Sequence, residues 1–570
     1  MKHIKFKKKV KIALTTVGML LLAFVPISIT SCSDEILNKQ PIGDIAGDDI
    51  FNDEGLLEAY VLGSYRAFRF FQFGAFFTEG STDNAVNVDG GAWITHNRGE
   101  TTADNGEEWT RNAWRENYTQ IRRINLYFDR IDGSSVSPEL TEKLTAEMRF
   151  IRAWCYFDLI GFYGGVPLVT ELFELGQESF DGTRASYDEV SAFIVNELDL
   201  AIPNLPEEAF DGQTGRATRG AAMALKSRAL LYAASPLNNP SNDMVKWQAA
   251  SDAAEAAMNL SEYGIDPDYS NLYNETRSME VMFGRGYTFE NPANFVDSFG
   301  WNWNFIIDRY YLPRGYFASD PRFIMPIQDL VDAYETLDGS PVDPQDPWTN
   351  RDPRLDMTII HHNSLVTSPD GPVTIEYHQD AADPNNADLS GLASAIRGGT
   401  QSQYNILKQT QPEEPLGLQN PNHLKPWIYF RLAEMYLNYA EAQIALGNED
   451  NARNAINTVR ARANVNMPPL TDSGSDLVQR YRNERRIEFA FENLRWYDIT
   501  RWQIGSETLT DTAYGITVLR DNSVSPSTDM YIYNDRIIDG LRTWNDNMAL
   551  FPIPRTEIEA SQNLEQNPGY

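Results

Sequence analysis

The sequence predicts a mainly α-helical protein in which paired helices form a scaffold that carries one long, loop-rich insertion. Apolar side chains recur every three or four positions before residue 265 and again after residue 423, the spacing of helices with a buried face. Between these parts, residues 266–422 are rich in proline, glycine, asparagine and aspartate, which favour turns and irregular loops. The chain has 570 residues and is 42% hydrophobic, so it can bury a sizeable core.

The clearest helical pattern lies in residues 427–465, where two helices are predicted on either side of Gly447. The first has two adjacent apolar stripes, as expected for a helix with more than one neighbour. The stripes are Ile428, Leu432, Met435, Tyr439 and Ala442, and beside them Tyr429, Ala433, Tyr436 and Ala440. Asn448 is expected to cap the second helix, whose inner face is Ala452, Ala455, Ile456, Val459 and Ala463. This hairpin resembles a tetratricopeptide-type repeat unit.

Further helices are predicted at residues 54–70, 114–131, 139–162, 186–200, 218–234 and 244–260. With the two at 427–465 they pair into about four hairpins, but their spacing is too irregular for a regular repeat array. Short strands are expected at residues 280–284 and 373–378. Prolines interrupt the tail, residues 550–570, so it is expected to run largely extended over the helices.

The N-terminus predicts export and membrane attachment. Lysines cluster within residues 2–11 and an apolar run follows at 12–29, the pattern of a secretory signal and not of a membrane span. The run leads into Ser31-Cys32, which resembles a bacterial lipobox. The resemblance implies cleavage before Cys32 and acylation of that cysteine, with palmitate among the chains; the alternative is an ordinary signal peptide. Asp34-Glu35 resembles the signal that sends Bacteroidetes lipoproteins to the cell surface.

The chain therefore divides into five predicted parts. These are a lipoprotein signal peptide (1–31), a lipid-anchored tether (32–50), an N-terminal helical scaffold with a binding loop (51–265), a loop-rich insertion (266–422), and a C-terminal helical scaffold with an extended tail (423–570).

Charge and cysteine content restrict the partners. The formal net charge is −32, which repels nucleic acid and suits neutral ligands or cations. Acidic loops are able to hold a structural calcium ion, but the sequence has no EF-hand loop, and no cofactor is predicted. With Cys32 acylated, the second cysteine, Cys155, has no disulfide partner and is expected in the core.

Carboxylates on the predicted helices allow two interpretations. Glu434 and Glu441 share a helix face, and a second group recurs at helical spacing beside Arg485 and Arg486. That group is Glu484, Glu488 and Glu492. A glycoside hydrolase would place two such carboxylates around a sugar bond. We favour the other interpretation, that these acids form ion pairs between packed helices.

Other catalytic or metal-binding patterns are absent from the sequence. It contains no HExxH, C-x-x-C, P-loop or G-x-S-x-G motif, so neither a zinc site nor a nucleophile elbow is indicated. His361 and His362 are adjacent at the end of an apolar run, and we expect them to bridge structural elements. The chain is therefore predicted not to be an enzyme.

Two loop clusters combine aromatic rings with polar side chains, the mixture that binds a neutral sugar through its C–H face and its hydroxyls. One cluster is Trp93, Asn97 and Arg98, and the other is Trp301, Trp303, Asp308, Arg309, Tyr310 and Tyr311. The alternative for any single tryptophan is a buried plug. We expect plugs at Trp154, Trp427, Trp496 and Trp502.

Several stretches together resemble the SusD/RagB nutrient-uptake lipoproteins of Bacteroidetes. They are the lipobox at Cys32, residues 146–169, 215–236, 350–355 and 427–502, and the LFPIP…NLEQNPGY tail at 550–570. The resemblance implies four tetratricopeptide-like units with a loop-rich ligand domain, held at the outer membrane by lipid and facing the exterior. It also implies a partner, a SusC-like TonB-dependent barrel, to which the protein delivers an oligosaccharide or polysaccharide. The alternatives are a surface glycoside hydrolase and a lid that binds peptides or another non-sugar nutrient.

Overall fold

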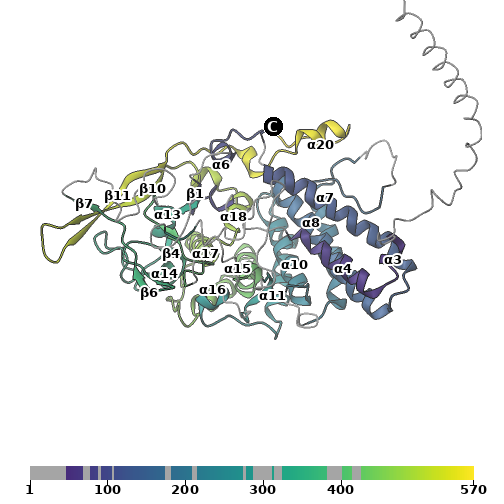
Figure 1. The fold of residues 1–570 in the computed structure, drawn as a ribbon, viewed down its shortest axis with the longest axis horizontal. Helices are drawn as coiled ribbons and strands as arrows, with labels where there is room; N and C mark the ends of the chain where they lie inside the picture. Colours follow the sequence, from purple (N-terminus) through teal and green to yellow (C-terminus); the bar gives the residue numbers. More distant parts are fainter. Residues whose placement is uncertain are drawn as a thin grey trace, which may run out of the picture.

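The computed structural model describes residues 47–68, 78–87, 92–105, 108–173, 182–207, 215–273, 278–286, 311–313, 324–381, 401–413 and 425–570. The predicted signal peptide and the acylation site Cys32 lie outside these residues. The described part is mainly helical (Figure 1), which confirms the predicted fold class. Within it, no helix combines the length and the apolar character that crossing a bilayer requires.

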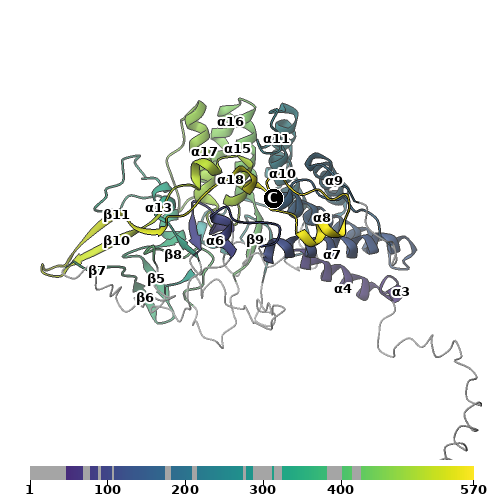
Figure 2. The same ribbon diagram turned by 90° about the horizontal axis from the view of Figure 1, so that it is seen from above.

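The longer helices form the scaffold. They are α4 (Glu54–Ser64), α7 (Glu108–Arg130), α8 (Pro138–Tyr163), α9 (Tyr187–Ala201), α10 (Arg219–Ala234), α11 (Met244–Met258), α15 (Leu432–Ala445), α16 (Glu449–Arg460) and α17 (Gly474–Glu488). Sequence neighbours pack together: α7 on α8, α8 on α9, α10 on α11, and α15 on α16. Helix α11 also packs against α15 (Figure 2), so the two helical parts are continuous although the insertion separates them in sequence.

Local signals explain where these helices begin and end. The Thr218 hydroxyl accepts a hydrogen bond from the backbone N–H of Ala221 and caps α10, and Ser186 forms a capping box with Glu189 at the start of α9, so free backbone donors are satisfied. Gly447 follows α15 with a φ of 81°, a conformation that glycine adopts without steric cost. The predicted helix at 54–70 ends earlier, at Ser64, and continues as a 3₁₀ turn, η1 (Tyr65–Ala67).

One helical prediction is wrong at its start. Residues Trp427–Arg431 form strand β9, so Ile428 and Tyr429 are not part of helix α15. Strand β9 pairs antiparallel with β2 (Val281–Arg285), which confirms the small strand predicted near residues 280–284. The run of bulky aromatic and β-branched side chains in β9 fits a pleated strand buried on both faces, and its helical spacing over one turn is a coincidence.

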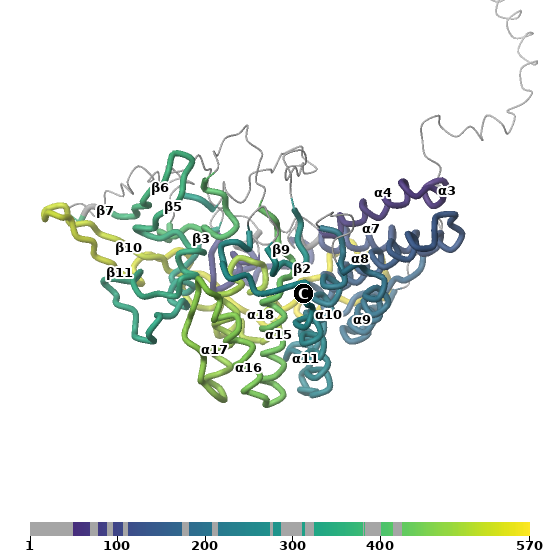
Figure 3. The backbone as a smooth tube through the Cα atoms, turned by 90° about the horizontal axis from the view of Figure 1, so that it is seen from below, coloured from purple at the N-terminus to yellow at the C-terminus, as the bar shows by residue number. Residues whose placement is uncertain are grey.

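The insertion contains short strands and helices. The strands are β3 (Ile324–Pro326), β4 (Ile359–Ile360), β5 (Leu365–Ser368), β6 (Gly371–Thr374), β7 (Gln379–Asp380) and β8 (Asn405–Ile406), and the helices are α13 (Gln328–Ala333) and α14 (Arg354–Thr358). Strand β3 pairs with β1 (Ala85–Asn87), β4 with β8, and β5 with β6. The strand predicted at 373–378 thus covers only the end of β6. Figure 3 shows helices α11, α15, α16 and α17 on one side and strands β2, β3 and β9 toward the other.

A long hairpin near the C-terminus was not predicted. Strands β10 (Ala513–Asp521) and β11 (Thr528–Asp539) pair antiparallel, and β7 adds to β10 in parallel. The hairpin projects at one end of the molecule, and α3 (Gly47–Ile50), where the described chain begins, lies at the other (Figure 1).

Shorter elements complete the described chain. They are α6 (Ala92–Asn97), α18 (Arg495–Arg501), α19 (Gly505–Thr508) and α20 (Arg555–Ala560), with the 3₁₀ turns η2 (Ile131–Gly133), η3 (Ile202–Asn204), η5 (Tyr269–Tyr273) and η6 (Asp546–Ala549).

The C-terminal tail follows the surface of the helices. Apart from α20 it is irregular, and the backbone N–H of Phe551 donates to the carbonyl of Phe162 at the end of α8 (2.7 Å). Phe551 and Ile553 are buried in the main hydrophobic core, which joins residues from Phe51 to Leu564. The extended tail is therefore confirmed, and the five domain boundaries stay predictions.

Candidate ligand-binding face

Strands β1 and β3 bring the attachment points of the two predicted ligand loops together. Asn87 in β1 pairs with Ile324 in β3. Four residues separate Asn87 from the start of helix α6, which contains Trp93, and twelve residues separate the end of the cluster at residues 301–311 from Ile324. Because paired strands lie about 5 Å apart, both aromatic clusters are connected to one small sheet.

Strands β2 and β9 bring a second pair of chain segments together. Arg285 in β2 pairs with Trp427 in β9, so the chain leaves one strand beside the point where it enters the other. The ring of Phe68 packs against Phe283 and Tyr429 of these strands, with centroids 4.8 and 5.4 Å away. The chain segments that follow residues 68 and 286 and the segment that precedes residue 425 are therefore attached beside one cluster of aromatic side chains.

The structure describes only part of the predicted ligand residues. Trp93 lies in α6, but its side chain is outside the described part, as are five residues of the second cluster. These are Trp301, Trp303, Asp308, Arg309 and Tyr310. Arg98 is described and exposed at the end of α6.

Two predicted ligand residues are buried. The Asn97 amide donates to the carbonyl of Gly80 (3.0 Å), and the Asn97 carbonyl accepts from the N–H of Thr543 (2.8 Å). Tyr311 is 1% exposed, its carbonyl accepts from the Asn405 amide (2.8 Å), and burial raises the pKa of its hydroxyl. Both residues therefore serve to fix the ends of their loops in the fold.

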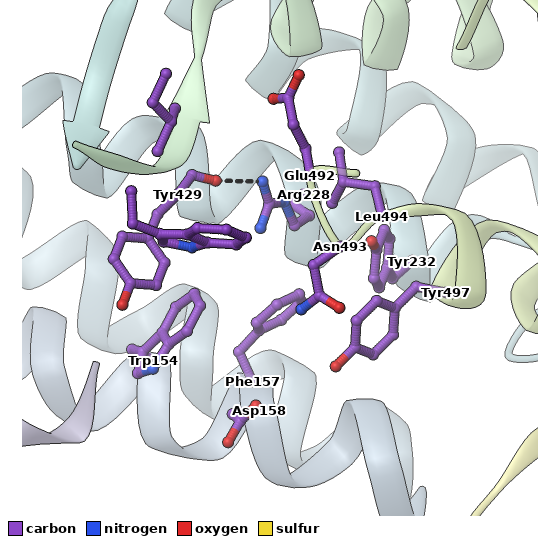
Figure 4. A pocket seen from close by; sticks show the side chains of 12 residues that line it. Trp154, Phe157, Asp158, Arg228, Tyr232, Tyr429, Glu492, Asn493, Leu494 and Tyr497 are labelled. Carbon is purple, nitrogen blue, oxygen red and sulfur yellow. Dashed lines mark hydrogen bonds between the residues drawn. The ribbon is translucent and has the colours of Figure 1, made fainter. Parts of the chain in front are cut away.

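An aromatic cleft lies beneath the β2–β9 pair, between helices α8 and α10 and the chain that follows α17 (Figure 4). Aromatic side chains dominate its lining, with four polar side chains among them. The aromatic residues are Trp154, Phe157, Tyr232, Trp427, Tyr429 and Tyr497, and the polar ones are Asp158, Arg228, Glu492 and Asn493. Its cavity volume is about 30 Å³, room for water but not for a sugar ring.

The residues of the aromatic cleft have structural partners. Arg228 pairs with Glu434 (2.6 Å) and donates to the Tyr429 carbonyl (2.6 Å, Figure 4). The tryptophans expected as plugs are buried, with exposed fractions of 2–5% for Trp154, Trp427, Trp496 and Trp502, which confirms that prediction. The aromatic cleft is thus a tightly packed part of the core beneath strands β2 and β9.

Three of the predicted carboxylates, Glu484, Glu488 and Glu492, belong to a buried ion-pair network between the scaffold and the insertion. Its cations are Arg354, Lys408, Arg431, Arg460 and Arg462, and its anions are Glu280, Glu335, Asp352, Glu484, Glu488 and Glu492. Arg431 illustrates the density, because it lies 2.7 Å from both Glu280 and Glu488. Buried charges require partners of this kind.

These contacts support the ion-pair interpretation and correct its details. The predicted neighbours Arg485 and Arg486 pair instead with Asp498 (2.8 Å) and Asp83 (3.2 Å), and Glu434 pairs with Arg228 on helix α10. The partners lie on other elements because a buried side chain pairs with the opposite charge that is nearest in the folded chain. That charge need not be one helical turn away in the sequence.

The electrostatics of these acids differ from those of a glycosidase. Burial disfavours the charge of Glu488, but Arg431, Arg462 and Arg354 outweigh burial and lower its pKa. At Glu441, Arg501 likewise outweighs burial and lowers the pKa to about 2. A general acid needs a raised pKa, so neither carboxylate is suited to protonating a leaving group.

The adjacent histidines bridge structural elements, as expected. His361 stacks on Trp348 (centroids 4.0 Å apart), and its Nε2 lies 2.6 Å from Asp356. His362 Nδ1 accepts from the N–H of Tyr377 (2.9 Å) and its Nε2 donates to Asp529 (3.0 Å), while burial lowers the His362 pKa. Among the described residues, no three His, Cys, Asp or Glu side chains are arranged to hold a metal ion.

One important turn was missed by the sequence analysis. Phe491 and Asn493, in the turn after α17, have φ values of 64° and 63°, which are rare for residues other than glycine. Asn493 accepts from the Thr78 hydroxyl, and the Phe491 carbonyl accepts from Gln409 (3.0 Å). The turn thus joins segments from distant parts of the chain. Asparagine tolerates this conformation, but nothing in the sequence marks Phe491.

Comparison with known proteins gives a consistent family. A family model described as the SusD family matches residues 284–570, and one described as starch-binding associating with outer membrane matches residues 41–231. A SusD-like protein of Bacteroides ovatus is 24% identical over 497 residues, which cover 85% of this chain and 82% of that protein.

Solved structures agree with the family models. A SusD-like protein from Bacteroides fragilis is 30% identical, with a TM-score of 0.74 and coverage of 93% of this chain and 100% of that chain. A SusD-like carbohydrate binding protein from the same species has 23% identity and a TM-score of 0.74, covering 90% and 100%. The helical scaffold, the order of the matched stretches and these comparisons lead to one conclusion: this chain is a member of the SusD/RagB family.

Proposed function

We propose that this protein binds an oligosaccharide or polysaccharide non-covalently at the face where its two aromatic loop clusters meet. The observation that carries the proposal is the pairing of Asn87 with Ile324, which joins the Trp93 loop and the 301–311 loop to one sheet. Rings from both loops then supply flat apolar faces for sugar rings, while Arg98, Asp308 and Arg309 supply hydrogen bonds to hydroxyl groups.

The relatives support a carbohydrate as the ligand. One family model carries the description starch-binding, and one similar structure is described as a carbohydrate binding protein. The strongly negative chain favours a neutral glycan over an anionic one. Within this proposal, the buried Asn97 and Tyr311 hold the loops, and the exposed residues contact the sugar.

We further propose delivery of the glycan to a SusC-like TonB-dependent transporter in the outer membrane. The description of one family model includes association with the outer membrane, and acylation of Cys32 would hold the protein at that surface. Replacing Cys32 by serine should release the protein from the membrane fraction and abolish labelling with a palmitate analogue. Purification from membranes under mild detergent should recover the transporter with the wild-type protein.

Calorimetry with a panel of neutral and anionic glycans and of peptides tests the binding step. We expect a neutral glycan to bind, and Trp93→Ala or Trp301→Ala to weaken binding on the order of tenfold, the effect of about 1.4 kcal/mol of lost stacking. Phe173→Ala is the matched control, because Phe173 is 37% exposed and lies next to helix α7.

Three outcomes would replace the proposal. Unchanged affinity in both tryptophan variants would remove the proposed site. Release of sugar products, abolished by replacing one carboxylate, would show a glycoside hydrolase. Binding of peptides without any glycan would show a lid for a non-sugar nutrient.

A further inference from the structure

Glu79 is a buried carboxylate held by neutral hydrogen-bond donors. It is 1% exposed. Its Oε1 accepts from the backbone N–H of Asn493 (3.1 Å), and its Oε2 accepts from the amide of Asn84 (3.1 Å). Among the described residues, no Lys, Arg or His nitrogen lies within 4.0 Å of it. Asp83, four residues later, instead receives two hydrogen bonds of 2.8 Å from Arg495.

The position of Glu79 connects both ligand loops to the scaffold. Its neighbour Gly80 accepts from Asn97 on α6 (3.0 Å), the helix that contains Trp93. The carbonyl of Asn84 accepts from the N–H of Ile327 (3.1 Å), directly after β3. Asn493 belongs to the turn after α17. Glu79 therefore lies where the base of α6, the β1–β3 sheet and the scaffold turn meet, and its carboxyl group bonds to the last two through Asn84 and Asn493.

The charged groups around Glu79 leave its own charge poorly compensated. Lys408 is bound to Glu492 (2.6 Å). Arg495 and Arg486 are bound to Asp83 at 2.8 and 3.2 Å. The hydroxyl of Tyr311 is neutral, because burial and, to a smaller extent, the charge of Glu79 raise its pKa. Burial raises the pKa of Glu79 to about 7, and the hydrogen bonds from Asn84 and Asn493 and the charges of Lys408 and Arg495 offset burial only in part.

We propose that Glu79 is a positioning residue through which pH acts on the ligand-binding face, because its carboxyl group joins Asn84 to the scaffold turn beside the Gly80 carbonyl that holds α6. The inference rests on the proposed function for the role of the loops. Its sign follows from linkage: the folded carboxyl holds its proton up to about pH 7, whereas the unfolded one loses it near 4.5. The stability that Glu79 contributes at this junction is therefore greatest below about pH 4.5, falls as the pH rises to about 7, and is constant at higher pH.

Hydrogen exchange measured by mass spectrometry on the mature chain, from about pH 5 to pH 8, tests this inference. After correction for the intrinsic exchange rate, protection of residues 78–97 in the wild type should fall by up to about tenfold per pH unit until about pH 7. Glu79→Gln should lack this fall. Glu100→Gln is the matched control, since Glu100 is exposed and lies three residues after the end of helix α6. The pH profile of protection in this variant should follow that of the wild type.

The outcomes separate the two proposals. A wild-type protection that does not depend on pH, or an equal fall in Glu79→Gln, would overturn the role of Glu79 whether or not any glycan binds. If Glu79→Gln does not fold, the wild-type profile alone decides, because a protection that stays constant between pH 5 and pH 7 would contradict a proton held by the buried carboxyl over that range. A maltooligosaccharide as probe should bind more weakly to the wild type at pH 8 than at pH 5.5, and equally at both in Glu79→Gln. Absence of binding at every pH would count against the proposed function alone.

Discussion

Replacing Arg354 by methionine should destabilise the protein by about 3–5 kcal/mol, because it removes the central cation of a buried cluster. Arg354 is 0% exposed and contacts Asp352 (2.7 Å), Glu484 (2.6 Å) and Glu488 (2.8 Å). Burial opposes its charge, but the three carboxylates outweigh burial and raise its pKa. Methionine keeps an unbranched side chain at this position, so the change in free energy reports mainly the lost ion pairs and hydrogen bonds and only in small part a cavity.

The distribution of the loss can be worked out from the remaining contacts. Glu484 keeps Arg460 (2.7 Å), and Glu488 keeps Arg431 (2.7 Å), whereas Asp352 loses its cation. The double variant Arg354→Met/Asp352→Asn removes the uncompensated charge as well, so we expect it to recover about 2 kcal/mol.

Urea unfolding followed by circular dichroism and tryptophan fluorescence measures these differences. Arg115→Met is the control, because Arg115 is 68% exposed in its pair with Glu116, and it should change the free energy of unfolding by less than about 0.5 kcal/mol. A loss in Arg354→Met no larger than in this control, or a double variant less stable than the single one, would refute the reasoning.

Three other predictions concern single sites. His96 is buried, which lowers its pKa to about 4; it therefore costs stability as the pH falls from about 6.5 to 4, and thermal unfolding of His96→Phe should lose less stability over that range. Asn567→Ala should cost about 2 kcal/mol in urea unfolding, because the amide donates to two backbone carbonyls and accepts from Arg184 (2.7 Å). A methyl group on Gly165 would lie 2.4 Å from the Ala185 carbonyl oxygen, so Gly165→Ala should lower the thermal midpoint, and an unchanged midpoint would contradict this close contact.

Much of the scaffold could be predicted because helices leave a local signal. The end of α8 before Gly164 and the start of α10 after Thr218 follow from capping and apolar spacing, which depend on a few neighbouring residues. Strand β9 could not be predicted in this way, because its partner β2 lies more than a hundred residues earlier in the chain. The β10–β11 hairpin alternates only weakly, since β10 is buried or half-buried on both faces and β11 has exposed residues on both faces.

The candidate site was predictable in outline and not in detail. Composition pointed to the loops around Trp93 and residues 301–311. It could not distinguish Arg98, which is exposed, from Asn97, which is buried and donates a hydrogen bond to the Gly80 carbonyl. The role of Glu79 leaves no sequence pattern at all. Its environment is created by Asn493, which is 414 residues away, and only the folded chain brings the two together.

The buried ion-pair network limits how this protein can change shape when it binds. Arg354 and Lys408 come from the insertion, whereas Glu484, Glu488 and Glu492 come from the scaffold. A hinge motion of the insertion against the scaffold would separate these pairs inside the protein, at a cost of several kcal/mol for each uncompensated charge. The two parts should therefore move as one body.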